Sequence, residues 1–392
     1  MPTPDTLSSD PPYESGPAAR TLVLHIGWAK TGTTSLQNFL KLNQDRLLGE
    51  HGVCYPCTGR KAAGQHRLGL CLREGGPEPR EVWSRLMAEL AAERGWHTAI
   101  VSSEALRNPD PQRLAMAAAL VPPEWQVLIV MYVRQPDLML ESLYLQELKG
   151  GYPWASFDKF LAAKRAAGEP DYEGAVTLYQ TGFPPPCARV VVRPFEREQW
   201  PDGDLVADFL QATGLGDVLA DETLRQPPRL NEKASPLLMS LVQALTRRLV
   251  GERKPGEQGG FGRLLPSIRM PETSPDEPVL FLDAETREAM RCEHDALFQR
   301  LGVSFLRRHA VVKGVAGDLP RFGSLEPSDR ERLLRRALEA AVIVGDQTIL
   351  ARRKAEAELG SKRARLRKLE ARCAEVDREL SRLRLVTGAR HH

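Results

Sequence analysis

A glycine- and threonine-rich segment near the start of the chain has the composition of an anion-binding turn. It runs from Gly27 to Ser35 with the sequence GWAKTGTTS and directly follows a short apolar run. Nucleotide kinases use the pattern GxxxxGK[ST] for this purpose. The segment keeps Gly27, Gly32 and the hydroxyl of Thr34 in that frame, but Thr33 stands where the pattern has lysine. The motif is therefore P-loop-like without being a kinase loop.

The lysine stands instead at position 30, three residues before the usual place. Backbone N–H groups of residues 31–34, at the start of a helix, can still surround one phosphate, and the hydroxyls of Thr33 and Thr34 add donors. Lys30 would lie over the oxygen that bridges this phosphate to a transferred group. Negative charge develops on that oxygen as the bond breaks, so the pattern favours group transfer from a nucleotide 5′-phosphate.

The elements that must position these residues alternate between strand and helix. Apolar runs at 21–27, 97–102, 125–133 and 188–192 predict strands, and amphipathic patterns at 35–48 and 138–149 predict helices. This alternation predicts an α/β fold, a doubly wound parallel sheet flanked by helices. Ligand sites in such sheets lie at the carboxyl ends of the strands. Lys30, Glu104 and Arg134 each come just after a predicted strand.

At this point the chain resembles a known family. Residues 25–27, 30–37 and 52–56 (HIG, KTGTTSLQ and GVCYP) are similar to the phosphosulfate loop of bacterial sulfotransferases. The resemblance covers roughly residues 21–306. It implies that the 5′ end of 3′-phosphoadenosine 5′-phosphosulfate (PAPS) is held by Lys30, Thr31, Gly32, Thr33, Thr34 and Ser35. Arg134 and Ser142 resemble the pair that holds the 3′-phosphate in this family, where Arg can make two parallel hydrogen bonds.

The resemblance also suggests which groups do chemistry. Glu104 closes the sequence VSSE at 101–104, which looks like the SSE segment of carbohydrate sulfotransferases. We expect it to be the general base, with the alternative that it only completes a helix start. His66 is similar to a histidine that follows the Tyr-Pro segment of the family, and it is a candidate for acceptor contact. His25 lies inside a predicted strand, which favours a core histidine over a base.

Three segments differ in composition from the rest of the chain: two lie outside the predicted catalytic domain, 21–320, and one is an insertion within it. Residues 1–20, rich in Pro, Ser and Asp, predict a disordered leader, and the Gly- and Pro-rich stretch 251–278 predicts a flexible insertion. Residues 327–390 are strongly helical in pattern. Leucine and other apolar residues recur at spacings of four and three over 355–383, which predicts a coiled coil, with a single packed helix as the alternative. Such a coiled coil would offer a surface for a second copy or a partner.

Composition limits the other classes of function. Residues 351–392 carry 13 Lys and Arg against 6 Asp and Glu, whereas the whole chain has a net charge of only +3, so attraction for nucleic acid would come from this tail alone. We expect a solvated basic helix instead. No apolar run is long enough to span a bilayer, and the leader lacks the pattern of a signal peptide, so we expect a cytoplasmic protein. The six cysteines predict reduced thiols, and Cys54, Cys57, His66 and Cys71 have irregular spacing for zinc.

These observations together predict a sulfotransferase that uses PAPS, needs no metal and acts on the hydroxyl of a small molecule or glycan. A carbohydrate or glycolipid is the acceptor that we favour. Two alternatives remain open, a P-loop kinase or other NTPase, and a non-catalytic nucleotide-fold scaffold that acts through its coiled coil.

Overall fold

The computed structural model describes residues 20–74, 79–150, 152, 154–184, 188–227, 239–241, 243, 244, 281–306, 319 and 324–335 of the 392-residue chain. By its internal contacts the chain divides into two compact units. The first unit holds residues 1–148, 153–239 and 276–319, and the second holds 149–152, 240–275 and 320–392. All candidate site residues belong to the first unit.

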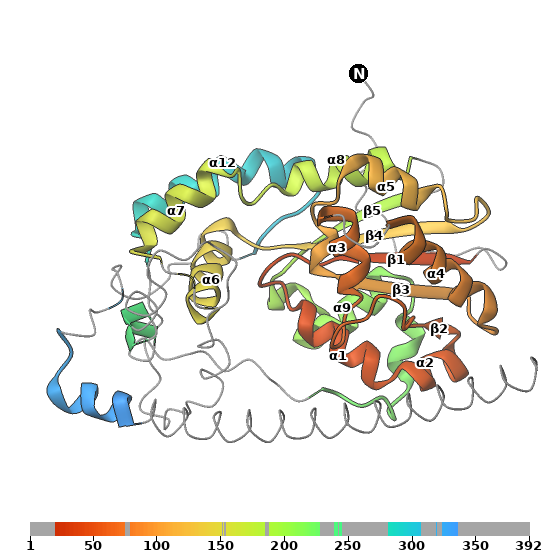
Figure 1. The fold of residues 1–392 in the computed structure, drawn as a ribbon, viewed down its shortest axis with the longest axis horizontal. Helices are drawn as coiled ribbons and strands as arrows, with labels where there is room; N and C mark the ends of the chain where they lie inside the picture. The colour runs from red at the N-terminus through yellow and green to blue at the C-terminus, as the bar shows by residue number, and fades with distance from the viewer. Residues whose placement is uncertain are drawn as a thin grey trace, which may run out of the picture. The chain divides into compact units, whose positions relative to one another are not determined.

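The described residues form one parallel sheet of five strands in the order β2-β3-β1-β4-β5 (Figure 1). The strands are β1 (Thr21–Ile26), β2 (Val53–Cys54), β3 (Thr98–Ser103), β4 (Gln126–Val133) and β5 (Ala188–Pro194). β1 lies between β3 and β4, with Thr21 paired to Thr98 on one side and to Gln126 on the other. The strands that follow β1 in the sequence therefore lie on both sides of it. This topology creates a ligand crevice at the carboxyl end of the sheet.

Helices cover both faces of this sheet (Figure 1). They are α1 (Thr33–Leu42), α2 (Gln44–His51), α3 (His66–Glu74), α4 (Pro79–Ala92), α5 (Pro111–Ala118), α6 (Pro136–Lys149), α7 (Phe157–Ala166), α8 (Tyr172–Gly182), α9 (Leu205–Ala212) and α12 (Ala284–Arg300). Short 3-10 helices follow β3 and the later loops, namely η1 (Glu104–Leu106), η2 (Arg197–Gln199), η3 (Pro201–Gly203) and η4 (Gly216–Ala220). The predicted α/β architecture with a helix-flanked parallel sheet is confirmed.

The central strands are buried on both faces because they separate two helical layers. Every residue of β1 (TLVLHI) and β3 (TAIVSS) is buried, including their threonine, serine and histidine side chains, as expected for parallel strands covered on both faces. One face packs on α1, α2 and α9 through Val23, Ile100, Leu128, Val130, Phe39 and Phe209. The opposite face packs on α3, α4, α5 and α8 through Leu22, Leu24, Val101, Ile129, Trp83 and Tyr179.

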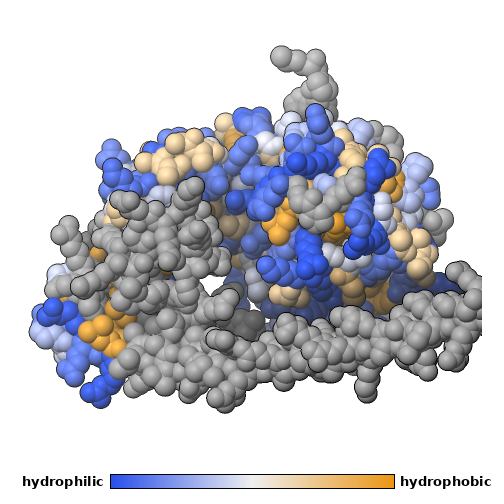
Figure 2. All heavy atoms as spheres, viewed as in Figure 1, coloured by the Kyte–Doolittle hydropathy of each residue, from blue (hydrophilic) through white to orange (hydrophobic). Residues whose placement is uncertain are grey.

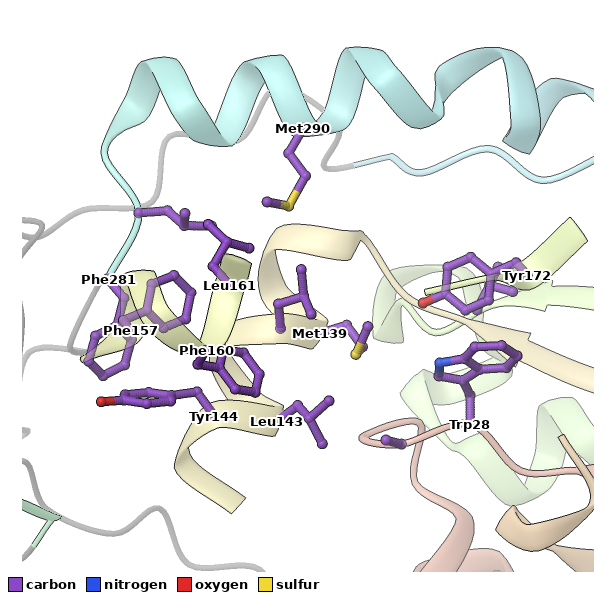
Figure 3. Packing of buried hydrophobic residues seen from close by; sticks show 14 of the residues in the cluster. Trp28, Met139, Leu143, Tyr144, Phe157, Phe160, Leu161, Tyr172, Phe281 and Met290 are labelled. Atoms are coloured by element: carbon purple, nitrogen blue, oxygen red, sulfur yellow. The ribbon is translucent and has the colours of Figure 1, made fainter. Parts of the chain in front are cut away.

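A further apolar cluster joins the carboxyl end of β4 to α6, α7 and α12 (Figure 3). Tyr144 of α6 contacts Phe157 and Phe160 of α7 at ring-centroid distances of 5.3 and 5.2 Å. Phe281, just before α12, stacks on Phe157 at 5.0 Å. This cluster fixes α6, the helix that directly follows Arg134, against the next helix, α7, and against α12, which comes much later in the sequence.

The structure differs from the predicted elements at two places. The helix expected over 35–48 is divided into α1 and α2, because the Asn43 side chain donates to the carbonyls of Phe39 and Arg225 and ends α1 there. The two-residue strand β2, paired in parallel with β3, is too short to give an alternating pattern. Residues 1–19 of the predicted leader 1–20, the insertion 251–278 and the coiled coil 355–383 lie outside the described residues, and residues 327–335 form a helix.

Most of the described residues on the face that Figure 2 shows are hydrophilic. On the face shown in Figure 2, hydrophobic residues appear over α3, α4 and α5 only as scattered groups. None of the helices that the structure describes combines the length and the low charge needed to cross a bilayer.

Candidate active site

The loop between β1 and α1 is held in its shape by its own backbone and threonine hydroxyls. Lys30 and Gly32 both have left-handed backbones, with φ of 66° and 71°. The carbonyl of Trp28 accepts hydrogen bonds from the Thr31 hydroxyl at 2.8 Å, from the Thr31 N–H at 3.4 Å and from the Thr33 hydroxyl at 3.4 Å. The carbonyl of Gly32 accepts a hydrogen bond from the N–H of Ser35, within the first turn of α1.

The start of α1 is open to an anion. Among the described residues no side chain caps it at Gly32, and its first turn contains no acidic residue. The first N–H groups of a helix have no intrahelical acceptor, so they can bind an external anion. Thr34 and Ser35 are exposed on this turn, whereas Thr31 and Thr33 are buried and use their hydroxyls within the loop. The hydroxyls left for a ligand are therefore those of Thr34 and Ser35.

Glu104 lies beside this loop at the first position of η1. A Cβ on Gly27 would come within 2.9 Å of the Thr33 hydroxyl and 3.0 Å of Glu104 Cγ, so both side chains close over that glycine. Burial raises the pKa of Glu104 above its ordinary value. The charges of Arg107 and Lys30 and a hydrogen bond with Thr33 act in the opposite direction. The predicted base thus lies in the electrostatic range of the displaced lysine.

His66, the weakest sequence candidate, comes to the same place at the start of α3. Its Nδ1 lies 3.1 Å from the hydroxyl of Ser103, the residue before Glu104. The Ser103 hydroxyl also accepts from the N–H of Ala105 at 3.1 Å, which caps η1. Burial and then the charge of Lys61 lower the pKa of His66. We therefore expect His66 to be a neutral imidazole at neutral pH, next to the predicted base.

Arg134 follows the last residue of β4 and reaches back to the loop. Its Nη1 donates to the carbonyl of Lys30 at 3.4 Å, and its guanidinium lies 5.8 Å from the ring centre of Phe195. The Tyr172 hydroxyl donates to the Arg134 carbonyl at 2.9 Å and accepts from its N–H at 3.3 Å. Burial lowers the pKa of Arg134, against opposing effects of Tyr172, Asp137 and Glu141. Among the described residues this is the one hydrogen bond of the Arg134 guanidinium, so most of the five donors of an arginine have no partner there.

Ser142, the predicted partner of Arg134, lies two turns along α6 and is partly buried. Within the part of the chain that the structure describes, no hydrogen bond joins the two side chains. Of the sequence candidates, Glu104 interacts with Lys30 and Thr33, and Arg134 donates to the Lys30 carbonyl. His66 joins them through Ser103, and Ser142 remains on the adjacent helix.

Three residues that the sequence reasoning did not assign connect the parts of the site. The ring of Trp28 packs on Tyr172 with centroids 4.6 Å apart (Figure 3), and the guanidinium of Arg107 lies 5.5 Å from the Trp28 ring. Trp28 thus contacts Arg107, the residue that follows η1, and it is linked to Arg134 through Tyr172. A tryptophan inside a Gly/Thr loop is a signal that sequence reasoning could have used, whereas Tyr172 carries none.

His25 and two of the cysteines, Cys54 and Cys71, belong to the core, whereas Cys57 and Cys292 are exposed. His25 is fully buried, its Nδ1 lies 2.8 Å from the Ser102 hydroxyl, and burial lowers its pKa to about 3. Cys54 and Cys71 are buried in the sheet core, and burial raises the pKa of Cys54 to about 12. In the described ranges, no three metal-binding side chains come together.

Comparisons with known proteins give limited likeness. No family model matches this chain. An uncharacterised protein of Archaeoglobus fulgidus is 32% identical over 121 residues, which are 31% of this chain and 30% of that protein. The chain thus matches less than a third of that relative's length. The crystal structure of a sulfotransferase from Alicyclobacillus acidocaldarius superposes with a TM-score of 0.33 and 19% identity, over 60% of this chain and 98% of that one. A TM-score this low carries no argument about function.

Proposed function

We propose that this chain is a sulfotransferase that moves a sulfuryl group from PAPS to the hydroxyl of an acceptor. The proposal rests on one observation, the meeting of Lys30, Glu104 and Arg134 at one edge of the sheet. Each follows the end of a different strand. Arg134 nevertheless donates a hydrogen bond to the Lys30 carbonyl, and the charge of Lys30 lowers the pKa of Glu104. A cation, a carboxylate and a second cation in this arrangement suit the transfer of an anionic group to a hydroxyl.

The residues present suit a ligand with two separate phosphate groups. The uncapped start of α1, with the exposed hydroxyls of Thr34 and Ser35, would hold the 5′-phosphate end. Arg134, with unused donors, would hold the 3′-phosphate, and Ser142 would add a donor from the next helix. Thr31, Gly32 and Thr33 would act mainly by shaping the loop, because Thr31 and Thr33 bond to Trp28.

The chemistry divides between Lys30 and Glu104. PAPS, when bound, supplies a sulfuryl group on a phosphate oxygen. A new bond forms between sulfur and the acceptor oxygen while the bond from sulfur to that phosphate oxygen breaks. Lys30 would stabilise the charge left on the phosphate, and Glu104 would take the acceptor proton. The raised pKa of Glu104 strengthens it as a proton acceptor. His66, hydrogen-bonded to Ser103, would contact the acceptor.

The acceptor stays the least defined part of the proposal. Acceptor pockets are built from loops around a shared core, so the core does not identify them. We favour a carbohydrate or glycolipid hydroxyl, on the likeness of the 101–104 segment to carbohydrate sulfotransferases. No metal is part of the proposed mechanism.

Calorimetric titration with adenosine 3′,5′-bisphosphate, beside ATP with magnesium, tests the proposal. We expect the bisphosphate to bind in preference to ATP and to bind less tightly to Arg134→Ala. Binding of ATP with magnesium alone would contradict the proposal and favour a kinase or NTPase. If the wild type binds neither the bisphosphate nor ATP, and Glu104→Ala binds a partner as well as the wild type does, a non-catalytic scaffold is favoured.

A further inference from the structure

A cluster of four buried charges lies directly behind Arg134. Asp137 and Glu141 come from the first turns of α6, and Arg287 and Arg291 come from α12. Arg287 Nη1 lies 2.6 Å from Asp137 Oδ2, and Arg291 Nη2 lies 2.8 Å from the same oxygen. Arg287 Nη2 also lies 2.8 Å from Glu141 Oε1. Two carboxylates thus face two guanidinium groups in a buried, neutral cluster.

These carboxylates also act on Arg134, which stands three residues before Asp137. Both Asp137 and Glu141 raise the pKa of Arg134, against the lowering effect of burial. Nevertheless, within the described part of the chain, Arg134 forms an ion pair with neither of them. Asp137 Oδ1 is buried and has no hydrogen-bond partner among the described residues, so it could still accept one. A competing acceptor for the Arg134 guanidinium is therefore close to it.

We infer that Arg287 and Arg291 are positioning residues for the anion site at Arg134. They hold the carboxylates of Asp137 and Glu141, so that the Arg134 guanidinium stays directed to the loop and available to a phosphate. This inference rests on the proposed function, because it assumes that Arg134 binds the 3′-phosphate of the donor. It assigns a role to α12, a helix about 150 residues away in sequence.

The physical reason is competition for one guanidinium. Arginine binds a carboxylate with the same two parallel hydrogen bonds that it offers to a phosphate. In a buried site of low dielectric constant, a carboxylate that has lost its partner must find another cation or take up a proton. Arg134 is a cation that both carboxylates already affect. Loss of an α12 arginine would therefore turn Asp137 toward Arg134 and away from the ligand.

Other contacts keep this cluster in place without involving Arg134. Glu141 Oε1 accepts from the N–H groups of Phe281 and Leu282 at 2.8 and 3.1 Å, just before α12 begins. Arg291 Nε adds a third contact to Asp137 Oδ2 at 3.2 Å. The α12 side of the cluster is thus fixed by backbone as well as by charge. A single Arg291→Gln change removes one partner of Asp137 and leaves Arg287 and Glu141 paired.

The experiment compares two ligands that differ only in the 3′-phosphate, adenosine 3′,5′-bisphosphate and adenosine 5′-monophosphate. We expect Arg291→Gln to lower bisphosphate affinity by about tenfold or more, the loss expected for a charge-assisted hydrogen bond. Its monophosphate affinity should stay that of the wild type. Asp137→Asn combined with Arg291→Gln should restore the ratio of the two affinities. Arg300→Gln, which removes an exposed arginine of α12 paired with Glu173 at 2.9 Å, is the matched control and should change neither affinity.

Two other outcomes for Arg291→Gln overturn the inference. Equal loss of both ligands in Arg291→Gln would show a general structural role, and no loss would show that Asp137 does not compete. If Arg291→Gln does not fold, the double variant is compared with the wild type. An unchanged affinity ratio supports the inference, and a reduced ratio means that Arg291 itself contacts the phosphate. Failure of the wild type to bind the bisphosphate would instead overturn the proposed function.

Discussion

The two candidate anion sites of this chain are built in different ways. The site at the start of α1 is made by neighbouring residues, and its donors are backbone N–H groups and the hydroxyls of Thr34 and Ser35. The site at Arg134 depends on one side chain that is held from four directions. Tyr172 bonds to its backbone, Phe195 faces its guanidinium, the Lys30 carbonyl accepts from it, and the α6–α12 cluster occupies the carboxylates behind it.

The first site therefore depends on the shape of the backbone, and the second depends on the charge of one side chain. The first site should fail when the backbone of the loop changes, whatever the charge of the side chains. The second should fail when one charge is removed, even if the backbone stays as it is. Glu104, which lies beside the loop, should matter for the transfer step and for neither binding event.

The largest effect is expected at Glu104. Glu104→Gln keeps the shape but cannot take a proton, so the transfer rate should fall by about 10²- to 10⁴-fold. Affinity for adenosine 3′,5′-bisphosphate should be unchanged, as measured by calorimetry beside a transfer assay. The melting temperature should rise, because a buried carboxylate that burial disfavours has been removed. Unchanged transfer by this variant would contradict a role as base.

Lys30→Ala should separate transfer from binding at the first site. Loss of the cation that stabilises the leaving phosphate should slow transfer by about 10²- to 10³-fold. Monophosphate affinity should fall less, because the backbone donors remain. Lys30→Gly is the matched control, since it removes the same charge and relieves the left-handed backbone at φ 66°. Both variants should lose similar transfer activity, and a large difference would mean that loop shape explains the loss.

Arg134→Ala should show that the second site depends on one charge. We expect bisphosphate affinity to fall by about 10- to 100-fold, and monophosphate affinity to stay within error, as the lost hydrogen bonds reach only the 3′-phosphate. Arg134→Lys should recover only part of the loss, because lysine cannot make two parallel hydrogen bonds. An equal loss of both ligands would break the distinction between the two sites.

Gly32→Ala should disturb the first site through backbone shape alone. Gly32 has φ 71°, and an added Cβ would lie 2.3 Å from Leu205 Cδ2 and 3.0 Å from Phe195 Cε2. We expect a loss of about 1–3 kcal/mol in the free energy of unfolding and weaker binding of both ligands. Gly95→Ala has a similar φ of 79° with no atom within 4 Å, so it supplies the strain without the contact. Its stability loss should be smaller, at about 1–2 kcal/mol, and it should bind both ligands normally.

The smallest effect is a displacement of the pH profile. Because the base must be ionised, kcat/KM should fall as pH decreases through the pKa of Glu104. Burial raises that pKa, so the fall should occur above the ordinary glutamate pKa of about 4.3. Arg107→Gln removes a charge that lowers the pKa, and should move the fall to still higher pH. If the pH profile of Arg107→Gln is the same as that of the wild type, the titrating group is not Glu104.

The sequence predicted the sheet well because four of its strands are built around short apolar runs. Four of the five strands lie where the apolar runs stand, and they pair in parallel as the alternation with helices indicated. β2, with two residues, is too short for any periodicity. The division of α1 from α2 depends on Asn43 reaching the carbonyl of Arg225, a contact across 182 residues that no local pattern contains.

The candidate site was predictable where its chemistry is local. Lys30, Glu104 and Arg134 follow three strands, and the parallel order of the sheet brings those strand ends together. The inward use of the Thr31 and Thr33 hydroxyls was not predictable, because it depends on the Trp28 carbonyl turning into the loop. Tyr172 and the arginines of α12 carry no motif, and only packing brings them to Arg134.

By itself the sequence determined the alternation of buried strands and helices and the identity of the groups at the strand ends. Hydrophobic periodicity and glycine placement are local properties, and they act before any distant contact forms. Tertiary structure decided which hydroxyls remain open, that burial raises the pKa of Glu104, and that α12 rather than Arg134 pairs with Asp137. These outcomes depend on desolvation and on competition between charges far apart in the chain, which exist only once the core has closed.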